Sequence, residues 1–394
     1  MTAHDENAAL DRFLHLTAIP GGSGDEAAVA AAITKVLIDA GVDESNISYD
    51  GAESRTRLDG NCGNLIVKLP GSGSGPRTLL SAHMDTVPIC LGAQPVVEGG
   101  QVKSGVATGL GADDRSGCAA ILTAAVERLR QGDENFPPAV LGFFVQEEIG
   151  LEGARNLDVD LVGKVDRAFN FDGGTIEKIT TGAIGGERMT IRITGVPAHA
   201  GVAPEKGASA IVMASRAIAD LDARGWLGKV VQSGAMGTSN VGVFNGGEAT
   251  NVVTPEVNLR AEARSHDAEM RTRIVAEIRS AFEKAAAEVV NADGQCGTVE
   301  FDSHVDYEAF ELSEGHPSVA AAKAALEIVG REPFTEVSNG GLDANWLFLH
   351  GIQAVTLGCG QQNIHTADER LEIADYQDAC RVATYLITEG ANHA

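Results

Sequence analysis

The chain has 394 residues, of which 44% are hydrophobic, 5% aromatic and 22% charged. This hydrophobic fraction excludes a largely disordered chain, and the length exceeds what a single hydrophobic core usually supports, so we expect two domains. The formal net charge of −25 repels phosphate backbones and anionic lipids, which argues against nucleic acid or a membrane surface as a partner.

The N-terminal segment and the cysteines indicate where the protein resides. The start, MTAHDENAAL, lacks the basic stretch and apolar core of a signal peptide, and no apolar run approaches the roughly 20 residues that span a bilayer. Six cysteines are scattered without a CxxC pair, which favours reduced thiols over a disulfide framework or a thiolate metal site. Together these features predict a cytoplasmic protein.

Helices and short apolar strands alternate in the first part of the chain. Residues 9–41 read as helical, because apolar positions recur every three or four residues. Apolar runs predict strands over 63–69, 77–85, 139–148 and 166–174, and an amphipathic helix is predicted over 115–130. Because polar residues stand at the strand C-terminal ends, we expect an α/β fold with a mostly parallel sheet.

The pattern changes near residue 186. Alternating residue types predict half-exposed strands over 187–195, 257–265 and 298–310, with a helix from about 267 to 290. After Ser313 the alternation of helix and strand resumes. The simplest account is a first domain formed by 1–185 and 311–394, interrupted by an inserted α+β domain over 186–310.

Acidic residues and a histidine stand where successive strands of the first domain end. They are His83 and Asp85, Asp113 and Asp114, Glu147 and Glu148, and Asp172. The C-terminal ends of neighbouring parallel strands converge on one crevice. An acid just before a helix is often a cap, which fits at least one of Asp113 and Asp114. Several carboxylates in one cleft repel one another, and a divalent cation is the usual remedy.

The spacing within these pairs suggests distinct roles. In His83-x-Asp85 on an extended strand, one side chain can bind a metal while the other orients its ring. Glu147 and Glu148 are neighbours on a strand end and therefore point apart, so one can bind metal while the other faces a substrate as a general base. Lewis acid, activated water and proton carrier are what metal-assisted hydrolysis requires. Histidine and carboxylate ligands without thiolate fit Zn²⁺, and also Co²⁺ or Mn²⁺.

One more ligand is expected from the closing part of the chain. His365 follows the apolar run AVTLG and lies in a polar loop. A loop histidine is more often an ordinary surface residue, but the position of His365 after a predicted sheet strand favours it over the other histidines.

The segments SAHMDTVP, GLGADDRSG, VQEEIGLEGA, the FDGG containing Asp172, and NIHTADE resemble, in this order, the motifs of the M20 family of co-catalytic zinc peptidases. Within that family the chain most resembles the peptidase T-like (tripeptidase) branch, over almost its whole length. The resemblance implies a two-zinc exopeptidase that acts as an aminopeptidase on short peptides. It implies that His83 and Asp172 complete one metal site and Glu148 and His365 the other, with Asp113 bridging them.

The resemblance also implies roles beyond the metal ligands. Asp85 would orient His83, and Glu147 would be the general base. The inserted domain would be a lid and dimerisation domain, whose His199, in GVPAHAG, reaches the active site of the partner subunit in a homodimer. Arg264 matches a lid arginine that binds a substrate carboxylate, and a planar guanidinium suits that task.

The expected substrate pocket combines residues of two distant segments. Asn251, Gly340 and Gly341 are expected to line it, the glycines by letting backbone approach the ligand. Leu342 and Asn345 depart from the GGTDG-like sequence of many relatives, which weakens any transfer of substrate preference. The metal ligands are unaffected by this departure.

Two other functions remain open. An M20-type deacylase of N-acyl amino acids, or a carboxypeptidase, would use the same metals and base but recognise another substrate terminus. A catalytically silent binding protein on the same scaffold is the alternative from another class, and the intact Glu147 argues against it.

Overall fold

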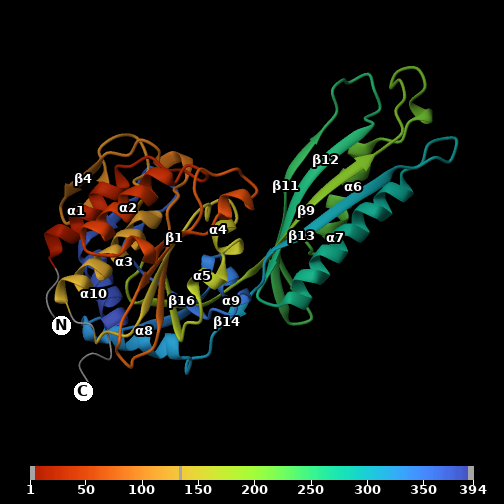
Figure 1. The fold of residues 1–394 in the computed structure, drawn as a ribbon. Coiled ribbons are helices and arrows are strands. Elements are labelled where there is room, and N and C mark those ends of the chain that lie inside the picture. The colour runs from red at the N-terminus through yellow and green to blue at the C-terminus, as the bar shows by residue number, and fades with distance from the viewer. Residues whose placement is uncertain (1–4, 133–134, 389–394) are drawn as a thin grey trace. The chain divides into compact units, whose positions relative to one another are not determined.

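The computed structural model describes residues 5–132 and 135–388. The described chain folds into two compact units (Figure 1). The main unit comprises the described residues up to Ala183 and from Glu311 onward, and the inserted unit is Ile184–Phe310. In the described chain, the main unit contains two sheets and the inserted unit one, and each unit has its own helices.

A nine-stranded sheet forms the centre of the main unit. Its order is β1-β2-β6-β3-β7-β16-β8-β14, and β15 pairs with β8. The middle strands β6, β3, β7 and β16 run parallel and are buried along their whole length, as their continuous apolar sequences predict. The strands are β1 (Ile47–Tyr49), β2 (Leu65–Leu69), β3 (Thr78–His83), β6 (Ala139–Phe144), β7 (Arg167–Phe171), β8 (Lys178–Ala183), β14 (Phe310–Glu311), β15 (Phe334–Ser338) and β16 (Ala354–Leu357). The predicted mostly parallel α/β fold is confirmed.

Helices pack against this sheet and against one another. The long helix α3 contacts β3 and β7 and is flanked by α1 and α10, which lie beside it in Figure 1. The Tyr376 hydroxyl of α10 donates a hydrogen bond to the Ala9 carbonyl of α1 (2.8 Å) and ties the two ends of the chain together. The helices are α1 (Glu6–Thr17), α2 (Ala27–Asp39), α3 (Ala112–Gln131), α4 (Glu152–Arg155), α5 (Val159–Val162), α8 (Pro317–Ile328), α9 (Asp343–Leu349) and α10 (Ile373–Thr388), with short 3₁₀ turns at Glu44–Asn46, Ala52–Ser54 and Pro88–Cys90.

A small antiparallel sheet joins two distant segments of the main unit. Its order is β17-β18-β5-β4, with β4 (Pro95–Glu98), β5 (Gln101–Ser104), β17 (Gln361–Gln362) and β18 (Arg370–Glu372). The pairing of β18 with β5 places the segment after His365 next to the segment that precedes α3. The sequence did not predict this sheet, because its strands are two to four residues long.

The inserted unit is a five-stranded antiparallel sheet with two helices along one face (Figure 1). Its order is β10-β11-β12-β9-β13. The elements are β9 (Gly185–Thr194), α6 (Ala210–Ala223), β10 (Gly228–Gln232), β11 (Ala235–Gly246), β12 (Glu256–Ser265), α7 (Ala268–Glu288) and β13 (Thr298–Tyr307), with a 3₁₀ turn at Pro204–Lys206. Burial alternates along β9, and its inward residues Ile191 and Ile193 pack with Phe282 of α7 in a separate hydrophobic core.

None of the described helices is long and apolar enough to cross a membrane. All six cysteines, which lie within the described residues, are free thiols.

Candidate metal centre

Three elements of the main unit deliver acids and a histidine to one edge of its sheet. Strand β3 ends at His83, β7 ends directly before Asp172, and α3 carries Asp113 in its first turn. Because β3 and β7 are parallel neighbours, their C-terminal ends lie side by side. The loop after β17 contributes His365 to the same place.

Asp113 lies between the two histidines. Its Oδ1 is 3.2 Å from His83 Nε2, and its Oδ2 is 3.2 Å from His365 Nε2. Each histidine also faces a second carboxylate: His365 Nε2 is 2.9 Å from Glu148 Oε1, and His83 Nε2 is 3.9 Å from Asp172 Oδ1. Ligand atoms of His83, Asp113 and Glu148 lie within 4.8 Å of one another, close enough to hold one ion. The five residues that the sequence suggested as ligands are thus brought together.

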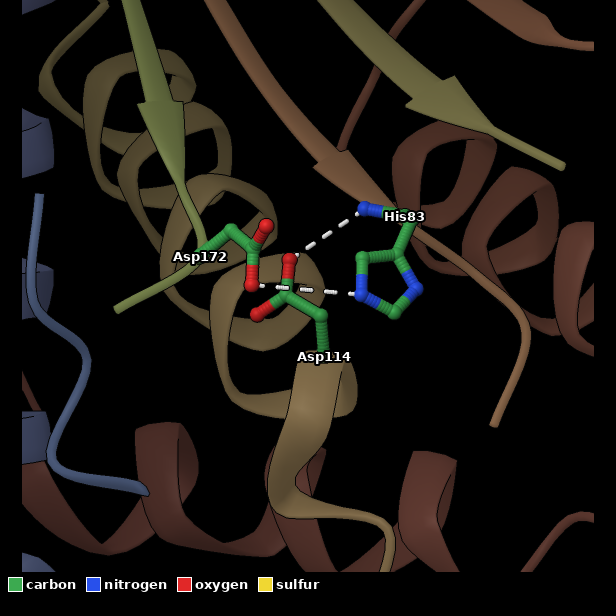
Figure 2. Close-up of side chains that lie close together, drawn as sticks. All are labelled: His83, Asp114 and Asp172. Carbon is green, nitrogen blue, oxygen red and sulfur yellow. Dashed lines mark hydrogen bonds and ion pairs between the residues drawn. The ribbon is translucent and has the colours of Figure 1, made fainter. Parts of the chain in front are cut away.

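His83, Asp114 and Asp172 form a second group whose ligand atoms could hold an ion (Figure 2). In this group, however, both oxygens of Asp114 already accept backbone hydrogen bonds. Oδ2 accepts from the His83 N–H (3.2 Å), and Oδ1 accepts from the Gly117 N–H (3.1 Å) within the first turn of α3. Asp114 therefore fills the capping role that the sequence allowed for one of the two acids, and Asp113, joined to it by a cis peptide bond, has both oxygens facing the histidines.

Asp85 is fully buried behind His83 and makes contacts with both of its oxygens. Oδ1 is 3.3 Å from His83 Nδ1 and accepts the Glu147 N–H (3.0 Å). Oδ2 accepts from the Ser23 hydroxyl (2.6 Å) and from the Glu148 N–H (3.2 Å). One carboxylate thus positions the ring of His83 and the backbone of both glutamates. The sequence suggested the first of these contacts and gave no signal for the others.

The two glutamates lie beyond their strand rather than on it. The predicted strand reached Glu148, but β6 ends at Phe144, and Gln146 turns the chain with a φ of 53°. The prediction that the two side chains point apart because of strand geometry was therefore wrong. Both line the same cavity, with Glu147 Oε2 4.0 Å from His83 Nε2 and Glu148 next to His365.

A cavity of about 420 Å³ opens onto these side chains. Gly340 and Gly341 line it, as the sequence predicted, and a Cβ atom built at Gly340 would meet only Ser338 Oγ, at 3.6 Å. A ligand can therefore approach this backbone closely. The lining residues are His83, Asp113, Glu147, Glu148, Asp172, Gly173, Gly174, Lys178, Ser338, Gly340, Gly341, Leu342, Gln361, Gln362, Asn363, Ile364 and His365.

Burial and crowding shift the pKa values of these groups. Burial raises the pKa of Glu147 and that of Asp172 well above the ordinary range, and the negative charge of Asp113 adds to the shift of Asp172. Hydrogen bonding to Asp113 raises the pKa of His365 to about 10. Burial opposes the charging of His83, but its hydrogen bonds to Asp113 and Asp85 and the negative charges of nearby carboxylates together outweigh burial and raise its pKa well above the usual value. The two histidines, Glu147 and Asp172 therefore keep their protons to a higher pH than usual, because these protons offset the negative charge of the crowded carboxylates.

This donor set fits divalent cations. The facing groups are imidazole nitrogens and carboxylate oxygens, a mixture that Zn²⁺, Co²⁺ and Mn²⁺ accept. A cation would replace the protons that otherwise offset the crowded carboxylates. The structure therefore contains the residues that a metal centre requires.

Two further polar residues, Gln361 at the site and Asp343 near it, were not singled out from the sequence. The Gln361 amide lies close to two acids, with Nε2 3.4 Å from Asp113 Oδ1 and 3.5 Å from Asp172 Oδ1, while its oxygen accepts from Ser116. Asp343 is fully buried, its carboxylate oxygens have no hydrogen-bond partner among the described residues, and burial raises its pKa to about 7. In the sequence, only the position of Asp343 shortly after the expected pocket residues Gly340 and Gly341 could have drawn attention to it.

The three predicted site residues of the inserted unit have local partners. His199 is exposed, and its Nδ1 accepts the Gly201 N–H (3.2 Å). Arg264 donates through Nε and Nη2 to the carboxylate of Glu262, at 3.2 and 3.1 Å. The Asn251 carbonyl accepts the Ala200 N–H at 2.9 Å. Their proposed roles toward a substrate remain predictions.

Comparison with known proteins identifies the family. A model of Peptidase family M20/M25/M40 matches residues 79–389. The uncharacterized protein YqjE of Bacillus subtilis is 35% identical over 390 residues, which cover 98% of this chain and 99% of that protein.

Solved structures agree with this assignment. A tripeptidase from Staphylococcus aureus superposes with a TM-score of 0.88 at 31% identity, and aminopeptidase PepT from Bacillus cereus with a TM-score of 0.85 at 33% identity. Both alignments cover 99% of this chain and 100% of the other. The resemblance seen in the sequence is confirmed: the chain belongs to peptidase family M20/M25/M40, in its peptidase T-like (tripeptidase) branch, and is a peptide-bond hydrolase.

Proposed function

We propose that this enzyme is a two-metal exopeptidase that removes the N-terminal residue from short peptides such as tripeptides. The observation that carries the proposal is the position of Asp113, which offers one oxygen to each of two histidines at 3.2 Å. A carboxylate in this position suits a shared ligand between two cations. The substrate class is supported by the similarity to the tripeptidase and to PepT.

The proposed ligands divide into two sets that share Asp113. His83 and Asp172 would hold one ion, and Glu148 and His365 the other, with zinc the expected metal. When bound, the ions would supply Lewis acidity to the scissile carbonyl and to the attacking water. The buried Asp85 would fix the His83 ring so that Nε2 faces the cavity, because its own oxygen faces Nδ1.

Glu147 is the proposed general base. It lines the cavity, is not among the proposed ligands, and its backbone is held by Asp85. Its carboxylate would take a proton from the attacking water and deliver it to the leaving amine. Burial raises its pKa, which suits a group that must hold a proton between these two steps.

The inserted unit would supply substrate contacts. Arg264 would bind a substrate carboxylate in place of Glu262, Asn251 would line the pocket, and the exposed His199 would reach the site of a second copy in a homodimer. These roles rest on the family resemblance. We also expect a cytoplasmic location, because the six cysteines form no CxxC pair and no disulfide framework.

A comparison of substrates tests the proposal. Zinc-loaded enzyme is incubated with a tripeptide, with the same tripeptide acetylated at its N-terminus, and with N-acetyl amino acids, and the products are identified by mass spectrometry. We expect a free N-terminal amino acid and a dipeptide from the first substrate only. Release of acetate without tripeptide cleavage would instead identify a deacylase, and release of the C-terminal residue a carboxypeptidase.

A further inference from the structure

Glu369 is a buried carboxylate that accepts hydrogen bonds from the loop leading into Asp113. It is 2% exposed. Its Oε2 accepts the N–H groups of Leu110 (2.8 Å) and Gly111 (2.7 Å) and the thiol of Cys90 (3.1 Å). Its Oε1 accepts the N–H of Asp113 itself (3.1 Å). Four donors therefore converge on one side chain, three of them from the backbone just before and at the proposed shared ligand.

The same side chain connects the two loops that face each other across the metal centre. Glu369 follows His365 by four residues, and its N–H donates to the Thr366 carbonyl (3.3 Å), so it belongs to the turn that presents His365. The loops that Glu369 connects carry His365 and Asp113, whose facing atoms, His365 Nε2 and Asp113 Oδ2, are 3.2 Å apart.

The local sequence allows this close approach. A Cβ atom at Gly109 would lie 2.6 Å from Cys90 Sγ and 3.0 Å from both Glu369 Oε2 and the Thr366 carbonyl. A glycine is therefore required where the two loops meet. The carboxylate is also the side chain best suited to the position, because hydrogen bonds to a charged acceptor are about twice as strong as neutral ones.

We infer that Glu369 is a positioning residue that holds Asp113 in place for both cations by accepting the N–H bonds of residues 110–113. The inference rests on the proposed function, because it assumes that Asp113 is shared by two ions. Glu369 does not line the cavity beside the metal centre and touches neither histidine ring, so it acts through Asp113. Its removal should therefore weaken metal binding and slow turnover with little change in the binding of the peptide.

The substitution Glu369→Gln tests this inference with minimal change of shape. Either orientation of the amide turns an NH₂ group toward backbone N–H donors, so at least one donor loses its partner. Glu372→Gln is the matched control: it neutralises a carboxylate three residues away, which accepts from Gln101 (2.7 Å) and Arg370 (3.2 Å) and not from residues 110–113. Glu369→Asp keeps the charge on a shorter side chain.

For each variant, Zn²⁺ affinity is measured by competition with a chromophoric chelator, the d–d absorption is recorded on Co²⁺-loaded protein, and kcat and KM are measured on a tripeptide. We expect Glu369→Gln to lose about 10- to 100-fold in metal affinity, which is the usual effect of losing a residue that orients a ligand. Its Co²⁺ spectrum should change and its kcat should fall, while KM stays within about twofold. Glu369→Asp should recover part of the affinity, and Glu372→Gln should match the wild type.

Wild-type metal affinity and Co²⁺ spectrum in a folded Glu369→Gln protein would overturn the inference, even if that protein melts at a lower temperature. Failure of both Glu369 variants to fold, with Glu372→Gln folded, would also overturn it, because Glu369 would then serve the fold rather than the site. The metal stoichiometry of the wild type is measured before any variant is compared. If the wild type binds fewer than two ions, the proposed function itself fails, whatever the variants show.

Discussion

Glu147 is the side chain on which the proposed chemistry depends most. It lines the cavity, and its Oε2 is 4.0 Å from His83 Nε2, a proposed ligand atom. Glu147→Gln should lower kcat on a tripeptide by roughly 10²- to 10⁴-fold, the range that general acid–base catalysis contributes. Metal content should not change, because Glu147 is not a proposed ligand. Turnover at the wild-type rate in metal-replete Glu147→Gln protein would contradict the proposed role of Glu147 as the general base.

Glu26 makes folding stability depend on pH. Burial raises its pKa to about 7 from the ordinary 4.5, and the nearby charge of Asp85 adds to the shift. The folded state therefore binds this proton more tightly than the unfolded state does. The resulting stability is fully present below about pH 4.5 and is lost as the pH rises through about 7, to a total of roughly 3–4 kcal/mol.

The substitution Glu26→Gln keeps a neutral side chain at every pH and still offers an oxygen to the N–H groups of Gly24 and Gln146, which now donate to Glu26. Urea unfolding of both proteins at pH 5 and pH 8 measures the effect. We expect similar stability at pH 5 and a more stable Glu26→Gln protein at pH 8. The same difference between the two proteins at both pH values would contradict this account.

At the scale of single residues, the sequence predicted which residues gather at the candidate metal centre better than it predicted their contacts. His83, Asp113, Glu148, Asp172 and His365 came from strand ends and family motifs, and the structure brings them together. The second contacts of Asp85 and the four donors of Glu369 were not predictable, because they join residues far apart in the sequence. Only the three-dimensional arrangement of the loops shows which buried acid faces which N–H group.

Among the elements, α3 is placed by its contact with β7, and Gly117 makes that contact possible. A Cβ atom at this position would lie 1.9 Å from the Phe171 carbonyl oxygen and 2.6 Å from Asp114 Oδ1. Gly117→Ala should therefore push the start of α3, with Asp113, away from the end of β7 and cost about 1–3 kcal/mol in the free energy of unfolding. The loss is measured by urea unfolding of the metal-free protein, together with Zn²⁺ affinity.

Gly315→Ala is the control for this prediction, because a Cβ atom there meets nothing within 4 Å. We expect it to change stability by less than about 0.5 kcal/mol. Equal effects of the two substitutions would show that close packing of α3 on β7 is not what places Asp113.

The elements that the sequence predicted well are the long and strongly patterned ones. The helix expected over 115–130 is α3, and the apolar runs over 77–85, 139–148 and 166–174 contain the buried parallel strands β3, β6 and β7. The run over 63–69 contains β2, which pairs antiparallel with β6. The sequence did not predict strand β11, because AMGTSNVGVFNG is rich in small and polar residues. Its extended form depends on pairing with β10 and β12. The loop holding Glu147 and Glu148 was taken for strand because the apolar run continues to Val145, one residue beyond β6.

At the scale of the whole molecule, the two units should respond differently to metal. All proposed ligands lie in the main unit, and the inserted unit has its own hydrophobic core. A ligand that binds only the folded state stabilises it by about 4 kcal/mol at a concentration 1,000 times its Kd. Zinc should therefore raise the Tm of the main unit and leave the transition of the inserted unit in place.

The two tryptophans of the chain separate these transitions. Trp226 lies in the inserted unit and Trp346 in α9 of the main unit. Trp226→Phe leaves a reporter on the main unit, and Trp346→Phe leaves one on the inserted unit. We expect EDTA to lower the fluorescence-detected Tm only where Trp346 is kept. Equal shifts for both reporters would mean that the units unfold together.

The central claim is that Asp113 is shared by two cations, and metal stoichiometry tests it most directly. Protein saturated with Zn²⁺ and freed of excess metal is analysed by inductively coupled plasma mass spectrometry, alongside His365→Ala as a variant that loses one proposed ligand. We predict two equivalents of zinc per chain in the wild type and close to one in His365→Ala. A single equivalent in the wild type, unchanged in His365→Ala, would contradict the shared site.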